Sequence, residues 1–444
     1  MRAVERSAAM ASANLVDRQG HRTARACGRR AADGRRGRVL STALAAVLAA
    51  SAAAFPQSAV PLPVTGELQV NQAVAGNQEA PAAGMREDGV HVVVWQSAGQ
   101  DASGSAIVVR HFPADGSQPA NESVLNELTA GDQFAPAVSM NASGDWFAVW
   151  DTATAAQGLR GRATTGGGTV VGSELQASVS TNLANHGPIV SRADDGNSAV
   201  AWTTATGVAF RRFDATNAPL IADNSGPSGY TLQDAVALGI GPLGGAIFGF
   251  QAFDGNQLGP FVQRYRPNST LLGGGIEVAA LDSNSQESPD IDAAGDGSFV
   301  VTWVDDVLGL RARCFDSDGL ATSGELAVHP AASAPAGAPP QVAVNASGAF
   351  VVVFQDGADS EIRAREYDRL CLPIGAAFDV AETTLGTQSR PSAAAGGDRF
   401  VVAWETDALD GNGLAVARRL FRFRSIFTDR FESGGTAGWS VAVP

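Results

Sequence analysis

The sequence predicts an all-β protein, a seven-bladed β-propeller built from four-stranded antiparallel blades, and three observations lead to this prediction. Hydrophobic residues make up 45% of the 444 residues and charged residues only 17%, with 51 glycines and 21 prolines. This composition is typical of many short strands and turns. A segment of about 50 residues recurs seven times, which indicates a repeat architecture. In each copy an apolar run ends in an aromatic residue: Trp95, Trp150, Trp202, Phe250, Trp303, Phe354 and Trp404.

Each repeat contains signals for four strands. The aromatic run is the second strand, and a polar turn such as Asp292 to Gly295 predicts a hairpin before it. A proline 13 or 14 residues before the aromatic marks the first strand in six repeats, at positions 81, 136, 188, 289, 340 and 391, and Ala235 takes its place in the fourth. The third strand carries an arginine, an aromatic or both: Arg110 with Phe112, Arg162, Arg211 with Phe213, Tyr265, Arg313 with Phe315, Arg365 with Tyr367, and Arg418. A segment led by glutamate, such as Glu67 to Asn71 or Glu174 to Ala177, is the fourth.

The apolar second strands predict that the seven sheets are arranged in a ring. The run ending at Trp95 is apolar at every position, so both of its faces need cover, and one four-stranded sheet cannot supply it. Stacking seven sheets around an axis covers both faces of every sheet. The longest regular connection follows the glutamate segment, which places the step between blades there and the proline strand innermost. Residues 67–71 are then expected to pair with the strand around Arg418 and close the ring.

The N-terminal region predicts export. Residues 1–38 hold ten arginines, and the apolar run Val39 to Ala54 follows, which is the order of a signal peptide. Arg35 and Arg36 offer a degenerate twin-arginine signal, and a basic arm that binds nucleic acid is the alternative interpretation. The predicted organisation is a leader over residues 1–54, a linker over 55–65, the propeller over 66–425 and a tail over 426–444. The run is too short to span a membrane, and no later segment is longer.

The chain from residue 55 is strongly acidic. It keeps 21 of the 31 arginines and 42 of the 45 acidic residues, for a net charge of −21. Nucleic acid is therefore not expected as a partner. Cys314 and Cys371 are its only cysteines, and two alternatives stay open for them: a bridge between neighbouring repeats, or two buried thiols.

Motifs for catalysis are missing from the sequence. We find no G-x-S-x-G, P-loop or H-E-x-x-H pattern and no clustered histidines, so no catalytic or cofactor-binding residue is assigned. Calcium is the one cofactor considered, because three turns carry oxygen donors but no complete calcium loop. Their residues are Asp254, Asn256, Asp316, Asp318, Asp407, Asp410 and Asn412. The repeated arginines are expected to pair with repeated acids such as Glu67 or Glu174 rather than to bind anions.

The repeats resemble a large group of exported bacterial proteins with the pattern E-x-x-V-N, Q-x-x-P-x-V-A, D-x-x-G-x-F-V-V-x-W and R-x-F/Y-D-x-x-G. Matching segments are Glu67 to Asn71 and the Gln-x-x-Pro runs that end at Pro81, Pro136, Pro289 and Pro391. Residues 426–434, followed by Trp439 and Ser440, resemble the F-x-D-G-F-E-S-G tail of secreted proteins of Gram-negative bacteria, with Arg430 in place of the glycine. The resemblance implies a propeller and export, and it implies no particular activity.

The expected function is binding or structural support at the cell surface, in the periplasm or outside the cell. Loops at one rim or the mouth of the central channel are the expected binding surface, with an unknown protein or glycan as the ligand. A monomer is expected. The alternative is an extracellular hydrolase acting on glycans with paired carboxylates, although the sequence selects no pair among its acids.

Overall fold

A computed structural model describes residues 61–424 apart from 119, 154–157, 166–169, 180–186, 205–206, 228–229, 231, 242–243, 280–283 and 331–338. Every described residue lies in the unit Pro56–Pro444. The predicted leader, residues 1–54, and the predicted tail after residue 425 therefore lie outside the described residues. Among the described residues, no helix is long and apolar enough to cross a membrane.

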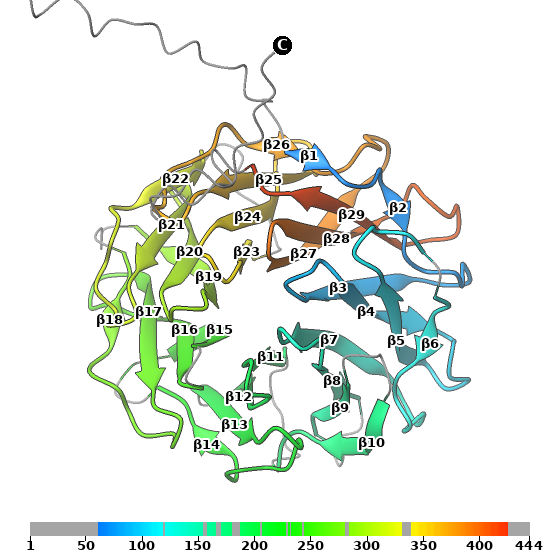
Figure 1. Ribbon diagram of the computed structural model, residues 1–444, viewed down its shortest axis with the longest axis horizontal. Helices are drawn as coiled ribbons and strands as arrows, with labels where there is room; N and C mark the ends of the chain where they lie inside the picture. The colour runs from blue at the N-terminus through cyan, green and yellow to red at the C-terminus, as the bar shows by residue number, and fades with distance from the viewer. Residues whose placement is uncertain are drawn as a thin grey trace, which may run out of the picture. The chain divides into compact units, whose positions relative to one another are not determined.

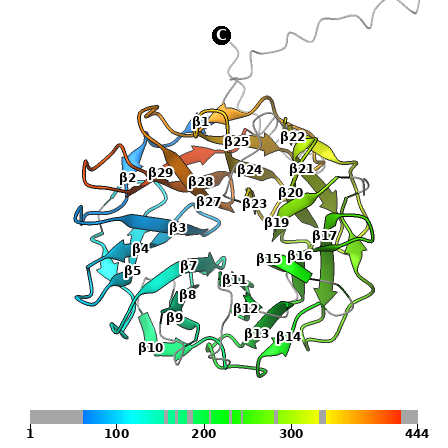
Figure 2. The same ribbon diagram turned by 180° about the vertical axis from the view of Figure 1, so that it is seen from behind.

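Seven antiparallel sheets form a ring, which confirms the predicted seven-bladed β-propeller (Figures 1 and 2). Within blades 1 to 6 the strands follow chain order from the channel outward, so each of these repeats of the sequence supplies one meander. The first strand of each repeat is innermost, as predicted for the proline strand, because these strands line the central channel.

Blades 1 to 6 have four strands each, and the strand bounds are as follows. Blade 1 contains β3 (Gln78–Met85), β4 (His91–Ala98), β5 (Ser105–Phe112) and β6 (Ser123–Val124). Blade 2 contains β7 (Gln133–Met140), β8 (Trp146–Thr152), β9 (Arg160–Thr164) and β10 (Val170–Gln176). Blade 3 contains β11 (Ile189–Arg192), β12 (Ser198–Thr204), β13 (Gly207–Phe213) and β14 (Asn224–Ser225).

The remaining blades have the same order. Blade 4 contains β15 (Leu232–Ile240), β16 (Ala246–Phe253), β17 (Leu258–Tyr265) and β18 (Ile276–Glu277). Blade 5 contains β19 (Gln286–Ala293), β20 (Phe299–Asp305), β21 (Gly309–Phe315) and β22 (Leu326–His329). Blade 6 contains β23 (Gln341–Val344), β24 (Phe350–Gln355), β25 (Ile362–Tyr367) and β26 (Phe378–Asp379). Blade 7 contains β27 (Gln388–Gly396), β28 (Arg399–Thr406) and β29 (Ala415–Arg422).

Two N-terminal segments complete blade 7 and close the ring. β2 (Leu68–Gln69) pairs with β29 in the register Leu68 with Arg418, which confirms the predicted closure. β1 (Leu62–Pro63) pairs with the far end of β29, so residues that the sequence analysis assigns to a linker also belong to the sheet. The first and last parts of the propeller thus share one sheet, which leaves no exposed terminal blade.

The prediction that a proline opens the inner strand holds for Pro188 and Pro340, which directly precede β11 and β23. The other four prolines sit at a bulge inside their strands. The strand begins three residues earlier, at the glutamine of each Gln-x-x-Pro run, and the ladder shifts register at the proline in blades 1, 2, 5 and 7. The residue before each of these prolines has positive φ: Ala80, Ala135, Ser288 and Arg390. The extra residue explains the proline, because a bulge leaves a position without a ladder hydrogen bond.

The aromatic of the second strand packs against the preceding blade in every blade except blade 4, where Phe250 packs with Phe261 and Tyr230. Trp95 lies with Val416 of blade 7, and Trp202 lies with Phe147 of blade 2. All six tryptophans of the described strands are fully buried. In blades 1 and 7 the indole N–H donates to the glutamine that begins the inner strand, from Trp95 to Gln78 at 3.0 Å and from Trp404 to Gln388 at 2.7 Å. In these two blades the recurring glutamine is therefore a partner of the recurring tryptophan.

Cys314 and Cys371 form a disulfide, which decides between the two alternatives left open by the sequence. Cys314 lies on β21 of blade 5, and Cys371 lies in the loop between β25 and β26 of blade 6. The bridge therefore joins neighbouring blades near one end of the ring.

Candidate functional site: the central channel

The inner strands of all seven blades surround a channel with a volume of about 300 Å³. Small residues dominate its wall, among them Ala82, Gly84, Ala137, Ser191 and Ala393. The proline strands are rich in alanine, glycine and serine because seven strands converge on the axis, where large side chains would collide. The resulting hollow is at the lower end of the size range of small-ligand sites.

Two carboxyl groups, Asp290 and Asp292 of β19, line this channel. Alternation along the strand places both on the same face. Asp290 Oδ2 accepts the backbone N–H of Val342 at 2.7 Å, and Asp292 Oδ2 accepts that of Val344 at 2.8 Å. Both donors belong to β23, the inner strand of blade 6. The two side chains therefore bridge the inner edges of two blades.

Serines form the same bridge at two other blade boundaries. Ser139 Oγ accepts the N–H of Arg192 at 3.0 Å, and Ser392 Oγ accepts the N–H of Ala83 at 3.1 Å. A neutral hydroxyl is thus sufficient to join two inner strands. Joining the inner strands of blades 5 and 6 therefore does not require the ionisable groups of the two aspartates.

Burial raises the pKa of both aspartates. The pKa of Asp290 rises to about 7, mainly because its carboxylate is poorly solvated, and the neighbouring charge of Asp292 raises it further. The pKa of Asp292 rises to about 6 for the same main reason. In both cases the bonds from backbone N–H groups act in the opposite direction, since they favour the carboxylate.

These pKa shifts predict a stability difference that depends on pH. A raised native pKa means that the folded state loses stability as pH rises from about 4 through about 7. Asp290→Asn removes the ionisation while keeping an acceptor for Val342. The variant is expected to be more stable than the parent by about 1–2 kcal/mol at pH 8 and equal to it near pH 4, measured by urea unfolding. The value is below the full shift because water in the channel screens the charge.

The matched control is Asp296→Asn in the neighbouring turn. The pKa of Asp296 is lowered by hydrogen bonds from Ser298, so its removal is expected to lower stability at pH 8, the opposite sign. If the stability of the parent protein did not fall relative to that of Asp290→Asn between pH 4 and 8, the raised pKa of Asp290 would be contradicted.

Two other carboxylates of the channel wall also connect blades, whereas the side chain of Arg192 bonds within blade 3. Glu87 Oε2 accepts the N–H of Gly397 at 2.8 Å, and Asp194 Oδ1 accepts the N–H of Ala142 at 2.9 Å. Arg192 donates to Ser198 and Asn217, both at 2.9 Å, and burial lowers its pKa. With four carboxyl groups and one guanidinium among its lining residues, the channel is acidic.

The calcium candidates lie in three separate turns. Asp254 and Asn256 are between β16 and β17 of blade 4, and Asp407, Asp410 and Asn412 are between β28 and β29 of blade 7. Asp316 and Asp318 lie between β21 and β22 of blade 5, at the opposite end of the ring, because successive turns of a meander alternate between its ends. The structure therefore does not bring the three turns together.

Within each turn, carboxylates accept backbone hydrogen bonds. Asp254 Oδ1 accepts the N–H of Asn256 at 2.7 Å, and Asp316 Oδ1 accepts those of Asp318 and Leu320 at 3.0 and 2.8 Å. Asp410 Oδ1 accepts the N–H of Asn412 at 3.0 Å. Among the described residues, no group of three or more His, Cys, Asp or Glu side chains is arranged to hold a metal.

The repeated arginines connect blades through backbone carbonyls more than through acids. Each reaches the last strand region of the preceding blade, where its Nη1 donates to a carbonyl at 2.6–3.2 Å: Arg110 to Val70, Arg162 to Leu125, Arg211 to Gln176, Arg313 to Val278, Arg365 to Ala327 and Val328, and Arg419 to Val380. The prediction of acid partners holds for some of them, as for Arg162 with Glu127 at 2.6 Å. The arginine of the seventh repeat is Arg419, not Arg418, and it lies over Phe421.

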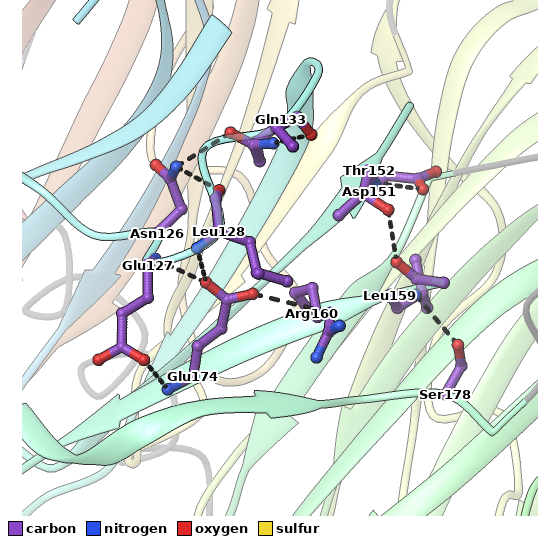
Figure 3. Close-up of polar contacts among 12 residues, drawn as sticks. Asn126, Glu127, Leu128, Gln133, Asp151, Thr152, Leu159, Arg160, Glu174 and Ser178 are labelled. Atoms are coloured by element: carbon purple, nitrogen blue, oxygen red, sulfur yellow. Dashed lines mark hydrogen bonds and ion pairs between the residues drawn. The ribbon is translucent and has the colours of Figure 1, made fainter. Parts of the chain in front are cut away.

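The repeated glutamates bind backbone amides of the adjacent blade. Figure 3 shows Glu174, whose Oε2 accepts the N–H groups of Glu127 and Leu128 at 2.6 and 3.0 Å, while Arg160 approaches Oε1 at 3.7 Å. Glu67 Oε2 likewise accepts the N–H groups of Glu382 and Thr383 at 2.6 and 2.8 Å. Both families of charged residue are accounted for by contacts between blades.

Sequence reasoning missed two polar arrangements. It found no cluster around the histidines, but His329, which ends β22, lies 3.1 Å from Asp356 Oδ2, which also pairs with Arg363. It treated Asp292 only as part of a turn and did not single out Asp290. The signal that could have identified Asp290 and Asp292 is their spacing. Two acids two residues apart on a strand that faces the channel both point into the channel.

Comparisons with known proteins support no family assignment. No protein-family model matches the sequence, and no curated protein matches it. Similar solved structures include a protein of unknown function from Dyadobacter fermentans (12% identity, TM-score 0.48, covering 81% of this chain and 98% of that one) and a puromycin hydrolase (17%, 0.45, 76% and 54%). Another is the Trypanosoma rangeli sialidase with the inhibitor DANA (10%, 0.42, 81% and 58%). The match thus covers little more than half of each of the two enzymes.

Proposed function

We propose that the protein is an exported binding module whose ligand site is the mouth of the central channel. The observation that carries this proposal is the acidic hollow of about 300 Å³, with small residues on its wall and two carboxyl groups facing it. The proposed localisation is the cell surface, the periplasm or the extracellular space. The disulfide between Cys314 and Cys371 supports export, since such bridges persist mainly outside the reducing cytosol.

A hydroxyl-rich glycan terminus is the ligand class that fits best. The small wall residues leave backbone groups accessible, and the Asp290 and Asp292 carboxyl groups offer acceptors to sugar hydroxyls. A hollow of this size accommodates one sugar ring or the tip of a protein loop. The acidic wall repels the phosphates of nucleic acid.

A glycan array tests the proposal with the chain from residue 55. We expect binding that falls at least about tenfold in the Asp290→Asn/Asp292→Asn variant and stays unchanged in Asp296→Asn, because only the former changes the channel wall. Binding that EDTA abolishes and added calcium restores would show that binding requires calcium. Absence of any bound glycan, or binding that the channel variant leaves intact, would contradict the glycan site.

Hydrolysis is the second candidate, and the raised pKa values favour it. A carboxylic acid with a pKa near 7 is suited to protonate a leaving group, and a second carboxylate nearby completes the pair used by glycosidases. Residues two apart on a strand have Cα atoms about 7 Å apart. The backbone bonds that Asp290 and Asp292 accept favour a structural role instead, since each already engages one carboxylate oxygen.

The two functions are distinguished by measuring whether new reducing ends are released from the glycans that bind. A binding module leaves the glycans intact over days. A hydrolase cleaves them, and Asp290→Asn would then lower the rate by more than about a hundredfold.

A further inference from the structure

Exposed leucines recur in the loops between the third and fourth strands of four consecutive blades. Since these are equivalent turns of the meanders, they lie at one end of the ring. A single exposed leucine in a loop needs no explanation, but the loop of blade 6 carries two. The residues and their exposed fractions are Leu220 (51%), Leu271 (46%), Leu320 (68%), Leu370 (68%) and Leu372 (58%).

The loop of blade 6 holds its two leucines outward. Asp368 Oδ1 accepts the N–H groups of Leu370 and Leu372 at 2.9 and 2.8 Å. Cys371, between them, is buried and bonded to Cys314 of blade 5. These contacts hold the backbone of the loop in the conformation that leaves both leucines exposed.

The chain leaves the propeller beside this loop. After β29, Phe423 packs on Phe400 with ring centroids 4.9 Å apart. The N–H of Arg424 then donates to Oε1 of Glu366 on β25 at 3.2 Å, and its Nε pairs with Oε2 of the same carboxylate. Glu366 is fully buried, so this contact fixes residue 424 on blade 6.

Residue 424 is also close to the leucines. Its guanidinium lies against Gly375, where a Cβ would come within 3.0 Å of Nη1. Gly375 follows Leu372 by three residues, a chain length of at most about 10 Å. The next apolar residues of the sequence, Ile426 and Phe427, are within the same reach of Arg424.

We propose that residues 425–431 dock on the blade 6 loop, with Ile426 and Phe427 covering Leu370 and Leu372. The physical drive is burial of apolar surface on both sides of the contact. Tethering at Arg424 gives the segment an effective concentration in the millimolar range, which a free partner rarely reaches. This argument favours the chain's own segment over a second copy or a lipid surface as the occupant.

Hydrogen exchange of the chain 55–444 tests this docking. The amides of residues 425–431 are expected to exchange at least about tenfold more slowly than in an unstructured peptide of the same sequence. Leu370→Ser/Leu372→Ser is expected to restore the peptide rate. Leu220→Ser/Leu271→Ser is the matched control, because it changes the equivalent loops of blades 3 and 4, and it is expected to leave the protection unchanged. Both pairs lie on the surface, and protected amides in β24 would confirm that the propeller remains folded.

Three outcomes would overturn the proposal. The first is exchange of residues 425–431 at the peptide rate in the parent protein. The second is protection that the Leu370→Ser/Leu372→Ser variant does not change. The third is protection of the blade 6 loop that rises with protein concentration, or only on addition of phosphatidylcholine vesicles, which would assign the leucines to a second copy or to a lipid surface.

Discussion

Deletion of residues 61–71 is expected to lower the free energy of unfolding by more than about 5 kcal/mol and to broaden the transition. The deletion removes β1 and β2, the backbone partners of β29. It also removes Val70, which is fully buried in the core between blades 7 and 1, and the carbonyl that Arg110 binds there. A buried valine contributes about 1.5–3 kcal/mol, and each unpaired buried polar group costs about 1–3 kcal/mol.

Urea unfolding followed by tryptophan fluorescence measures this loss. The chain beginning at residue 61 is the matched control, since it keeps both closing strands, and we expect it to unfold like the chain from residue 55. A point variant, Val70→Asp, is expected to reproduce much of the loss, because it places a charge in the same core. Leu62→Ser, at a position that is 63% exposed, is expected to have little effect. An unchanged midpoint in the deletion variant would show that the ring does not depend on this closure.

Removal of the disulfide is expected to cost about 3–4 kcal/mol of stability. Cys314 and Cys371 are 57 residues apart, and a bridge that closes a loop of that size restricts the unfolded chain by roughly this amount. Both residues are buried between blades 5 and 6, so alanine at each position leaves little new polar surface. The Cys314→Ala/Cys371→Ala variant is expected to keep the fold at a lower urea midpoint.

A reducing agent supplies the control for this experiment. The chain from residue 55 has no other cysteine, so dithiothreitol acts on this bridge alone. It is expected to lower the midpoint of the parent protein to that of the double variant and to leave the double variant unchanged. Equal midpoints for the parent protein with and without the reducing agent would contradict a stabilising bridge.

The repeat pattern carried most of the architecture. An apolar run such as the one ending at Trp95 needs cover on both faces, and seven such runs at a spacing of about 50 residues permit stacking around an axis. Innermost proline strands and closure by residues 67–71 followed from connection lengths alone. The register of the seventh arginine did not follow, because Arg418 and Arg419 are adjacent and only the pairing of β29 shows which one reaches Val380.

The sequence by itself determined the number of blades, the order of strands and the acidic character of the chain, because these depend on local patterns that repeat. Only the tertiary structure decided which polar residues meet. Asp290 and Asp292 became channel groups, and Cys314 reached Cys371, through contacts between different blades. Such contacts depend on how neighbouring sheets are inclined around the axis, and no pattern within a single repeat records that inclination.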